Sequence, residues 1–277
     1  MGQRGSTHTG SLTVVGIGFK FASHATVEAC GYIEHADKVL LMLADEAAMA
    51  WASDLNPTAQ SLPLYTEDDL PIDTYQTWMN VLAAWQERIL TPVRQGLAVC
   101  VVFHGHPGIG IAPIHETLRQ ARREGYPALM LPGLSAADCL FADLGVDPLR
   151  DGCQLFEATD YLIHRRAFST ASALVLWQIG MIGEFFQRKG SLNRQGLRVL
   201  VEVLQEAYGA DHDVILYEAA PYPIVEPVIV RLPLHRVPEA TVTELSTLYV
   251  PPKTEATPAP DPTMLDRLGI PPSRVRS

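Results

Sequence analysis

The stretch that decides the fold is Val99-Cys100-Val101-Val102-Phe103-His104-Gly105-His106-Pro107-Gly108-Ile109-Gly110. Five apolar residues run without a break and lead into a turn-forming segment of three glycines and one proline, which also contains two histidines. Continuous apolar runs are typical of buried parallel strands, and open α/β sheets bind ligands where such strands end. The stretch therefore predicts a strand that leads into the floor of a cofactor site.

Composition excludes several classes of protein. The chain has 277 residues and a formal net charge of -10, and general nucleic-acid binders normally carry a basic face, so we expect small molecules or a peptide as partners and no nucleic acid. The four cysteines (Cys30, Cys100, Cys139 and Cys153) are scattered singly, which favours reduced thiols over disulfides or zinc.

The hydropathy pattern contains no membrane or export signal. No stretch reaches the roughly 18 to 20 apolar residues of a membrane span, and residues 1–10 are polar and lack the apolar centre of a signal peptide. We therefore expect a cytoplasmic protein with no membrane partner.

The first half alternates strands and helices. Apolar runs predict strands at residues 11–15, 38–43, 99–103 and 128–131. Helical periodicity and caps predict helices at residues 23–35, 46–55, 73–94 and 113–124. This alternation predicts an α/β domain over residues 10–148, with a mostly parallel sheet covered by helices on both faces.

The second half changes character. Strands are predicted at residues 154–156, 173–178, 214–217, 228–232 and 247–250, with one long helix at 192–208. Five strands with one long helix favour a mixed sheet, and hence a second α/β domain over residues 149–252. Residues 253–277 begin with a proline-rich stretch and are expected to form a linker and tail.

Three simple chemical interpretations are disfavoured. Gly16-Ile17-Gly18 resembles a dinucleotide-binding turn, but Phe21 occupies the position of the third glycine, so nicotinamide binding is disfavoured. His104 and His106 could share a face as metal ligands, with His115 and Asp138 elsewhere, but loop packing is the commoner role and no metal is predicted. The sequence contains no Gly-x-Ser-x-Gly nucleophile elbow, so a serine hydrolase is disfavoured.

Two tyrosines bracket an acidic run in a long loop. Tyr65 precedes Glu67-Asp68-Asp69, and Tyr75 stands in the first turn of the helix that follows. By themselves these residues indicate a solvated turn and ordinary tyrosine packing. A role in steering a cationic group stays open.

Several segments together resemble the S-adenosylmethionine-dependent tetrapyrrole methylase superfamily and, within it, the borosin-type peptide α-N-methyltransferases. They run in family order over essentially the whole folded chain, from about residue 10 to residue 253. The segments that carry the resemblance are Gly10-Ser11-Leu12-Thr13-Val14-Val15-Gly16-Ile17-Gly18, Tyr32-Ile33-Glu34-His35-Ala36, Asp73-Thr74-Tyr75, Gly105-His106-Pro107-Gly108, Leu131-Pro132-Gly133-Leu134-Ser135-Ala136-Ala137-Asp138-Cys139-Leu140-Phe141-Ala142-Asp143-Leu144-Gly145, Leu176-Trp177-Gln178-Ile179-Gly180, Tyr217-Glu218-Ala219-Ala220 and Leu245-Ser246-Thr247-Leu248-Tyr249-Val250-Pro251-Pro252.

The resemblance implies a two-domain α/β fold of the tetrapyrrole methylase type, a homodimer, and S-adenosylmethionine bound in the cleft between domains. It also implies methylation of backbone amide nitrogens of a precursor peptide. Borosin enzymes carry that peptide at their own C-terminus or receive it on a separate small protein. Because this sequence stops just after its proline-rich segment, we expect the split form, which acts in trans on a separate peptide.

Carried over by position, the resemblance assigns cofactor contacts in four places. They are the glycine loop (His104, Gly105, His106, Pro107, Gly108 and Ile111), the start of a helix (Ser135 and Ala136), Gln178, and the pair Ser246 and Thr247. Such positions suit a zwitterionic, partly apolar ligand, which needs exposed backbone groups and a few polar side chains.

The resemblance assigns Tyr65 and Tyr75 to the substrate amide, but the catalytic region departs from the family pattern. Pro71 stands where the family has an arginine, and His104 and Leu62 stand where it has tyrosines. His104 is therefore a candidate replacement base. The alternatives are methylation of a small molecule such as a tetrapyrrole, or a cofactor-binding protein without turnover.

Overall fold

The computed structural model describes residues 9–20, 22–64, 74–183, 192–253 and 259–274. The chain divides into two compact units between Leu140 and Phe141, and residues 219–226 return to the first unit. The sequence-based domains were 10–148, 149–252 and a tail at 253–277. No helix of the described residues combines the length and the apolar character needed to cross a membrane.

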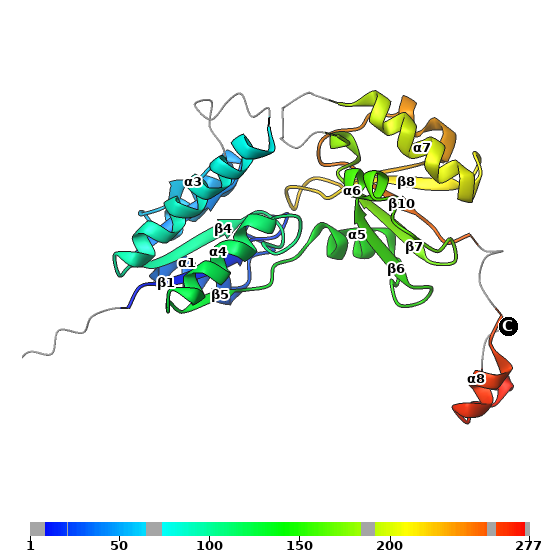
Figure 1. Cartoon of the computed structure of the whole chain (residues 1–277), viewed down its shortest axis with the longest axis horizontal. Coiled ribbons are helices and arrows are strands. Elements are labelled where there is room, and N and C mark those ends of the chain that lie inside the picture. Colours follow the sequence, from blue (N-terminus) through cyan, green and yellow to red (C-terminus); the bar gives the residue numbers. More distant parts are fainter. Residues whose placement is uncertain (1–8, 21, 65–73, 184–191, 254–258, 275–277) are drawn as a thin grey trace, which may run out of the picture. The chain divides into compact units, whose positions relative to one another are not determined.

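The first unit is built on a five-stranded sheet in which every pairing is parallel (Figure 1). Its strand order is β3-β2-β4-β1-β5. The strands are β1 Ser11–Gly16, β2 Lys38–Met42, β3 Gln60–Ser61, β4 Ala98–Phe103 and β5 Ala128–Met130. The central strand β4 is buried from Val99 to Phe103, as expected of a strand that is covered on both faces.

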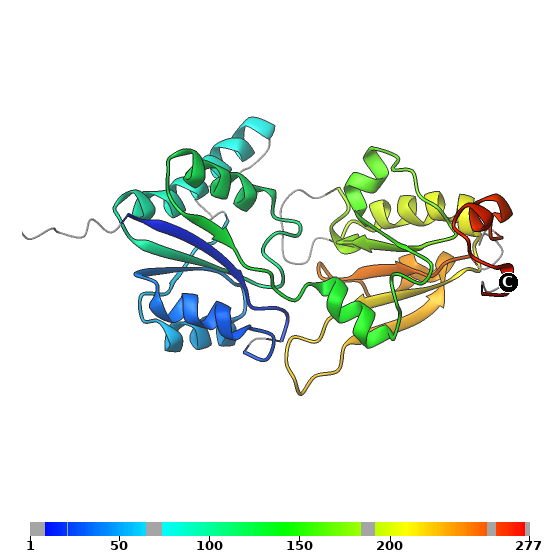
Figure 2. The ribbon, with the colours of Figure 1, turned by 90° about the horizontal axis from the view of Figure 1, so that it is seen from below.

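Helices cover both faces of this sheet. Helices α3 (Tyr75–Arg94) and α4 (Ala112–Arg123) pack on one face, and α1 (Val27–His35) and α2 (Glu46–Leu55) pack on the other (Figure 2). Alternate residues of β4 point into the hydrophobic cores on the two faces of the sheet. Val101 packs toward α3 and α4, whereas Val102 packs toward α1 and α2.

The second unit contains a mixed sheet of order β6-β7-β10-β8-β9. Strands β6 and β7 are parallel, and the other pairs are antiparallel. The strands are β6 Cys153–Glu157, β7 Ala173–Trp177, β8 Asp213–Glu218, β9 Val228–Pro233 and β10 Thr247–Val250. Helix α7 (Arg194–Tyr208) packs on one face through its buried leucines.

The predicted α/β fold, with a parallel first sheet and a mixed second sheet, is confirmed. The remaining elements are α5 (Ala136–Leu144), the short α6 (Ala158–Ile163), the tail helix α8 (Pro262–Arg267) and the 3-10 turns η2 (Ile179–Met181), η3 (Leu234–Glu239) and η5 (Pro272–Arg274). Helix α6 was not predicted, because six residues are too few to show a helical period.

Helices α1 and α3 begin later than the sequence predicts. Helix α1 begins at Val27 rather than near residue 23, because the hydroxyl of Thr26 accepts from the Ala29 N–H and caps it there. Helix α3 begins at Tyr75, and its N-cap is Thr74, whose Oγ1 accepts from the Thr77 N–H. Residue 73, the expected start of this helix, lies outside the described residues.

Helix α1 offers a test of the local backbone. A Cβ added to Gly31, in the middle of this helix, meets no atom within 4 Å. Gly31→Ala is therefore expected to raise the free energy of unfolding by about 1 kcal/mol, because it removes backbone entropy from the unfolded chain without a clash. Urea denaturation measures this change, and a lowered midpoint would contradict the described helix.

Candidate functional site

Loops from adjacent strands leave the first sheet at one edge. Phe103 of β4 is in register with Met42 of β2 and with Gly16 of β1, so the residues that follow these strands emerge together. His104 directly follows β4, and its ring lies against Phe19, which follows β1, at a centroid distance of 4.7 Å. This carboxyl edge is where parallel sheets usually bind ligands.

Four glycines bring the backbone together at this edge. Gly105 has a φ of +70° and exchanges two backbone hydrogen bonds with Gly18. A Cβ on Gly16 would lie 2.2 Å from the Gly105 oxygen, and one on Gly133 would lie 2.6 Å from the same oxygen. The loops after β1, β4 and β5 can therefore meet only if these positions lack side chains.

Two histidines, His106 in the loop and His115 on α4, have structural partners in the loop. The Gly108 N–H donates to Nδ1 of His106 over 2.9 Å, which places that ring's proton on Nε2 when the ring is neutral. His115, on α4, contacts the Gly108 carbonyl through Nε2 at 2.9 Å. Within the described residues no cluster of three histidine, cysteine, aspartate or glutamate side chains is arranged to hold a metal.

His104 is held differently. Its Nε2 lies 3.3 Å from the Phe19 carbonyl, and the side chain keeps an exposed surface. Loss of water around the ring lowers its pKa below the ordinary value of 6.5, while the Phe19 carbonyl and the charge of Asp45 oppose that shift. The ring is therefore largely neutral at neutral pH, which is the state that can accept a proton.

Ser135 and Ala136 lie at the start of α5, on the same unit. The Ser135 N–H and hydroxyl both donate to Oδ2 of Asp138, at 2.7 and 2.6 Å, which fixes the turn that leads from β5. Ser135 is 7% exposed, so it presents little side-chain surface to a ligand.

The other predicted cofactor residues belong to the second unit and form a group of their own. Gln178 follows β7 and lies in the left-handed region, with a φ of 58°, and its side chain is exposed. The Ile179 N–H donates to the Ser246 carbonyl, which joins this turn to the start of β10. Ser246 and Thr247 are 2% and 3% exposed, so their side chains present almost no surface to a ligand.

Glu218, at the end of β8, organises that group. Its Oε1 accepts from the hydroxyls of Thr243 (2.6 Å) and Ser246 (2.5 Å), and the Ser246 hydroxyl in turn accepts from the Thr243 N–H. The turn after β7 approaches Thr243 closely at Gly180, where a Cβ would lie 2.0 Å from the Thr243 carbonyl oxygen. Sequence reasoning gave Glu218 no role, because its partners stand 25 and 28 residues away.

The predicted catalytic tyrosines are only partly placed. Tyr75 is the first residue of α3, and 78% of its surface is exposed. Tyr65 and Pro71 lie outside the described residues.

The loop fits the polar end of S-adenosylmethionine. In the described part of the chain, the N–H groups of His106, Gly110 and Ile111 donate to no acceptor, and the loop around them is partly exposed. Backbone N–H groups of this kind suit a ligand carboxylate. The glycines of the loop let such a ligand approach the backbone closely.

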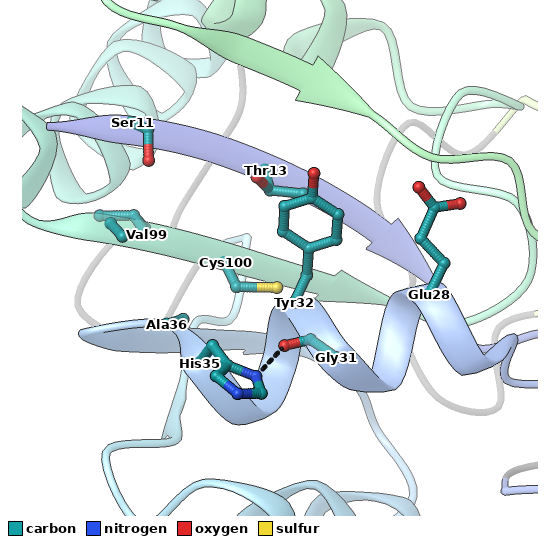
Figure 3. Close-up of a pocket in the computed structure, with 10 residues that line it drawn as sticks. Ser11, Thr13, Glu28, Gly31, Tyr32, His35, Ala36, Val99 and Cys100 are labelled. Carbon is teal, nitrogen blue, oxygen red and sulfur yellow. Dashed lines mark hydrogen bonds between the residues drawn. The ribbon is translucent and has the colours of Figure 1, made fainter.

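A separate cavity of about 440 Å³ lies at the opposite end of β1 and β4, beneath α1. Figure 3 shows Thr13, Tyr32 and Cys100 around it, with the ring of His35 bonded to the Gly31 carbonyl. Burial raises the pKa of the Cys100 thiol to about 12, so this thiol stays protonated and unreactive. None of the predicted cofactor residues lines this cavity.

Comparison with known protein families identifies the family of the chain. Residues 11–235 match the family described as Tetrapyrrole (Corrin/Porphyrin) Methylases. The chain belongs to this family. The resemblance to this superfamily that the sequence motifs suggested is thereby confirmed, because the match includes the whole first sheet and every strand of the second except β10.

Among curated relatives, the chain is 39% identical over 257 residues to a methyltransferase and ribosomally synthesized gymnopeptides precursor of Gymnopus fusipes, covering 91% of this chain and 60% of the relative. It is also 39% identical to a type I borosin cyclic peptide precursor of Coprinopsis marcescibilis, covering 88% and 62%. The chain thus spans about three fifths of the length of these curated relatives.

The fold of this tetrapyrrole methylase family member also resembles solved structures. A uroporphyrin-III-C-methyltransferase from Thermus thermophilus superposes with a TM-score of 0.61 at 19% identity, covering 91% of this chain and 98% of that one. At this identity the similarity supports the fold alone.

The glycine contact yields a prediction about ligand binding. Gly16→Ala is expected to weaken binding of S-adenosylhomocysteine at least tenfold, because its Cβ would displace Gly105 and Pro107 from the loop. Isothermal titration calorimetry measures the affinity. Gly31→Ala is the matched control, since it adds the same methyl group where nothing lies within 4 Å. Equal affinities for Gly16→Ala and the unaltered chain would show that the loop does not bind the cofactor.

Proposed function

We propose that the chain is an S-adenosylmethionine-dependent methyltransferase that methylates backbone amide nitrogens of a precursor peptide supplied on a separate chain. The observation that carries this proposal is the glycine-built loop at the carboxyl edge of the first sheet, in a member of a methylase family. The peptide substrate is supported by the curated relatives, whose names combine a methyltransferase with a ribosomally synthesized peptide precursor.

Amide methylation sets clear chemical requirements. The nitrogen lone pair is delocalised into the carbonyl, so the proton must be removed and the negative charge that develops on the oxygen stabilised. When bound, S-adenosylmethionine supplies an electrophilic methyl carbon on a positively charged sulfur. The protein must therefore hold the amide in line, exclude water and provide a base.

His104 is the residue best suited to the role of base. Its lowered pKa keeps the imidazole able to accept the amide proton at neutral pH, and it adjoins the backbone N–H groups of the glycine loop. We assign Tyr75 to orienting the amide and Tyr65 to holding its carbonyl, as the family resemblance implies. Gln178, Ser246 and Thr247 remain predicted cofactor contacts.

Methylation of a small cyclic molecule is the second candidate. Pro71 replaces the arginine that the borosin pattern uses near the amide, and loss of that cation favours a different acceptor. The homodimer and the cytoplasmic location remain predictions of the family resemblance and of the composition.

Mass spectrometry tests the proposed reaction. The chain is incubated with S-adenosylmethionine and either the small proteins encoded beside it or the segment of the Gymnopus fusipes relative that it does not match. We expect mass increments of single methyl groups that tandem fragmentation assigns to backbone nitrogens. Increments on side chains, or none on any peptide, would contradict peptide N-methylation.

The pH profile tests His104. Because the pKa of this ring lies below 6.5, kcat/KM is expected to rise with pH through a midpoint below pH 6.5 and then to level off as the neutral form predominates. His104→Asn should abolish this rise and lower the plateau about a hundredfold, the usual contribution of a general base. A midpoint above pH 6.5 would assign the base elsewhere.

Tyr75 can be tested separately from cofactor binding. Tyr75→Phe removes only a hydroxyl at the exposed start of α3, so the fold and the affinity for S-adenosylhomocysteine should not change. We expect kcat to fall about tenfold or more on a verified peptide, as loss of an orienting hydrogen bond predicts. Methylation at the full rate would remove Tyr75 from the reaction.

A further inference from the structure

A tyrosine from the second half of the chain is bonded to the carboxyl edge of the first sheet. The Tyr222 hydroxyl donates to Oδ2 of Asp45 over 2.5 Å, across 177 positions of sequence. The other carboxylate oxygen, Oδ1, accepts from the Ala48 N–H over 2.8 Å and caps α2. Asp45 thus uses one oxygen for its own helix and the other for a distant segment.

Tyr222 belongs to a segment that is built to be rigid. Residues 219–226, here called the strap, connect the paired ends of β8 and β9 and group with the first unit. Pro221 and Pro223 flank Tyr222 and fix their own φ angles, and the Val225 N–H donates to the Tyr222 carbonyl. Within this segment Ile224 is 94% exposed, whereas Tyr222 is half-buried against Asp45.

The bond lies beside the proposed base. Asp45 follows β2 by three residues and His104 follows β4 by one, and these neighbouring strands end in register at Met42 and Phe103. The carboxylate and the imidazole are close enough to influence each other, since the charge of Asp45 favours protonated His104. The Tyr222 bond lowers the pKa of Asp45 and so keeps this carboxylate charged.

We propose that Asp45 and Tyr222 are positioning residues, whose hydrogen bond holds the strap at the carboxyl edge as a fixed wall beside His104. The identity of the substrate that contacts the strap rests on the proposed function. Under that function, an incoming peptide would contact the strap next to His104. The hydrogen bond itself does not depend on what the substrate is. Neither residue touches the reacting atoms in this assignment.

Two variants separate the strap contact from the helix cap. Asp45→Ser keeps a good N-cap for α2 but is too short to reach Tyr222. Tyr222→Phe keeps the ring and removes only the hydroxyl. The control is Tyr217→Phe, which removes another tyrosine–aspartate hydrogen bond, the 2.7 Å contact with Asp143 in the second unit.

Hydrogen exchange tests the contact without any substrate. Tyr222→Phe and Asp45→Ser should each speed exchange of the strap amides about tenfold, and the double variant should be no faster than either one, because both remove the same bond. Tyr217→Phe should leave strap exchange unchanged. Unchanged exchange in Tyr222→Phe, or an effect of Asp45→Ser alone, would overturn the proposal.

Kinetics then tests the positioning role on whichever peptide accepts methyl groups. Both variants should raise KM for the peptide about tenfold and leave the affinity for S-adenosylhomocysteine within twofold, because the glycine loop is untouched. A fall in kcat at unchanged KM would overturn the assignment of the strap as a substrate wall. If the unaltered chain methylates no peptide, the proposed function fails, and hydrogen exchange still decides whether the strap is anchored.

Discussion

Close backbone contact among Gly16, Gly105 and Gly133 is the constraint on which the site depends. The loops after β1, β4 and β5 meet through the Gly105 carbonyl, at distances that a Cβ on either neighbour would not permit. The parallel register of the sheet brings these loops to one edge, and the glycines let them close there. A ligand at this edge therefore meets a floor of backbone N–H and C=O groups.

Most polar side chains near this floor are committed to holding it. His106 and His115 are both bonded to Gly108, and Asp138 fixes the turn at Ser135. This division separates residues that shape the loop from residues that can act on a substrate. His104 stands apart, since within the described residues its ring is hydrogen-bonded only to the Phe19 carbonyl, and the side chain keeps an exposed surface. The proposed chemistry therefore depends on the histidine that the loop does not use for its own stability.

Local features of the fold could be predicted from the sequence, and distant contacts could not. The apolar run at β4 and the glycines after it specify a buried strand and a tight loop at the carboxyl edge, because periodicity and turn chemistry act over a few residues. No local pattern reveals that Glu218 bonds Thr243 and Ser246, or that Tyr222 reaches Asp45. The family resemblance also assigned a cofactor contact to Ser246, whose hydroxyl is already bonded within the fold. Tertiary contacts of this kind decide which polar groups remain for a ligand.

The most direct test of the account is a crystal structure of the chain with S-adenosylhomocysteine. The account predicts that the carboxylate of this ligand accepts hydrogen bonds from the backbone N–H groups of the loop at residues 104–111, with Gly105 and Gly108 in contact with it. Binding in the cavity beneath α1, beside Thr13 and Cys100, would contradict the assignment of the glycine loop as the cofactor floor.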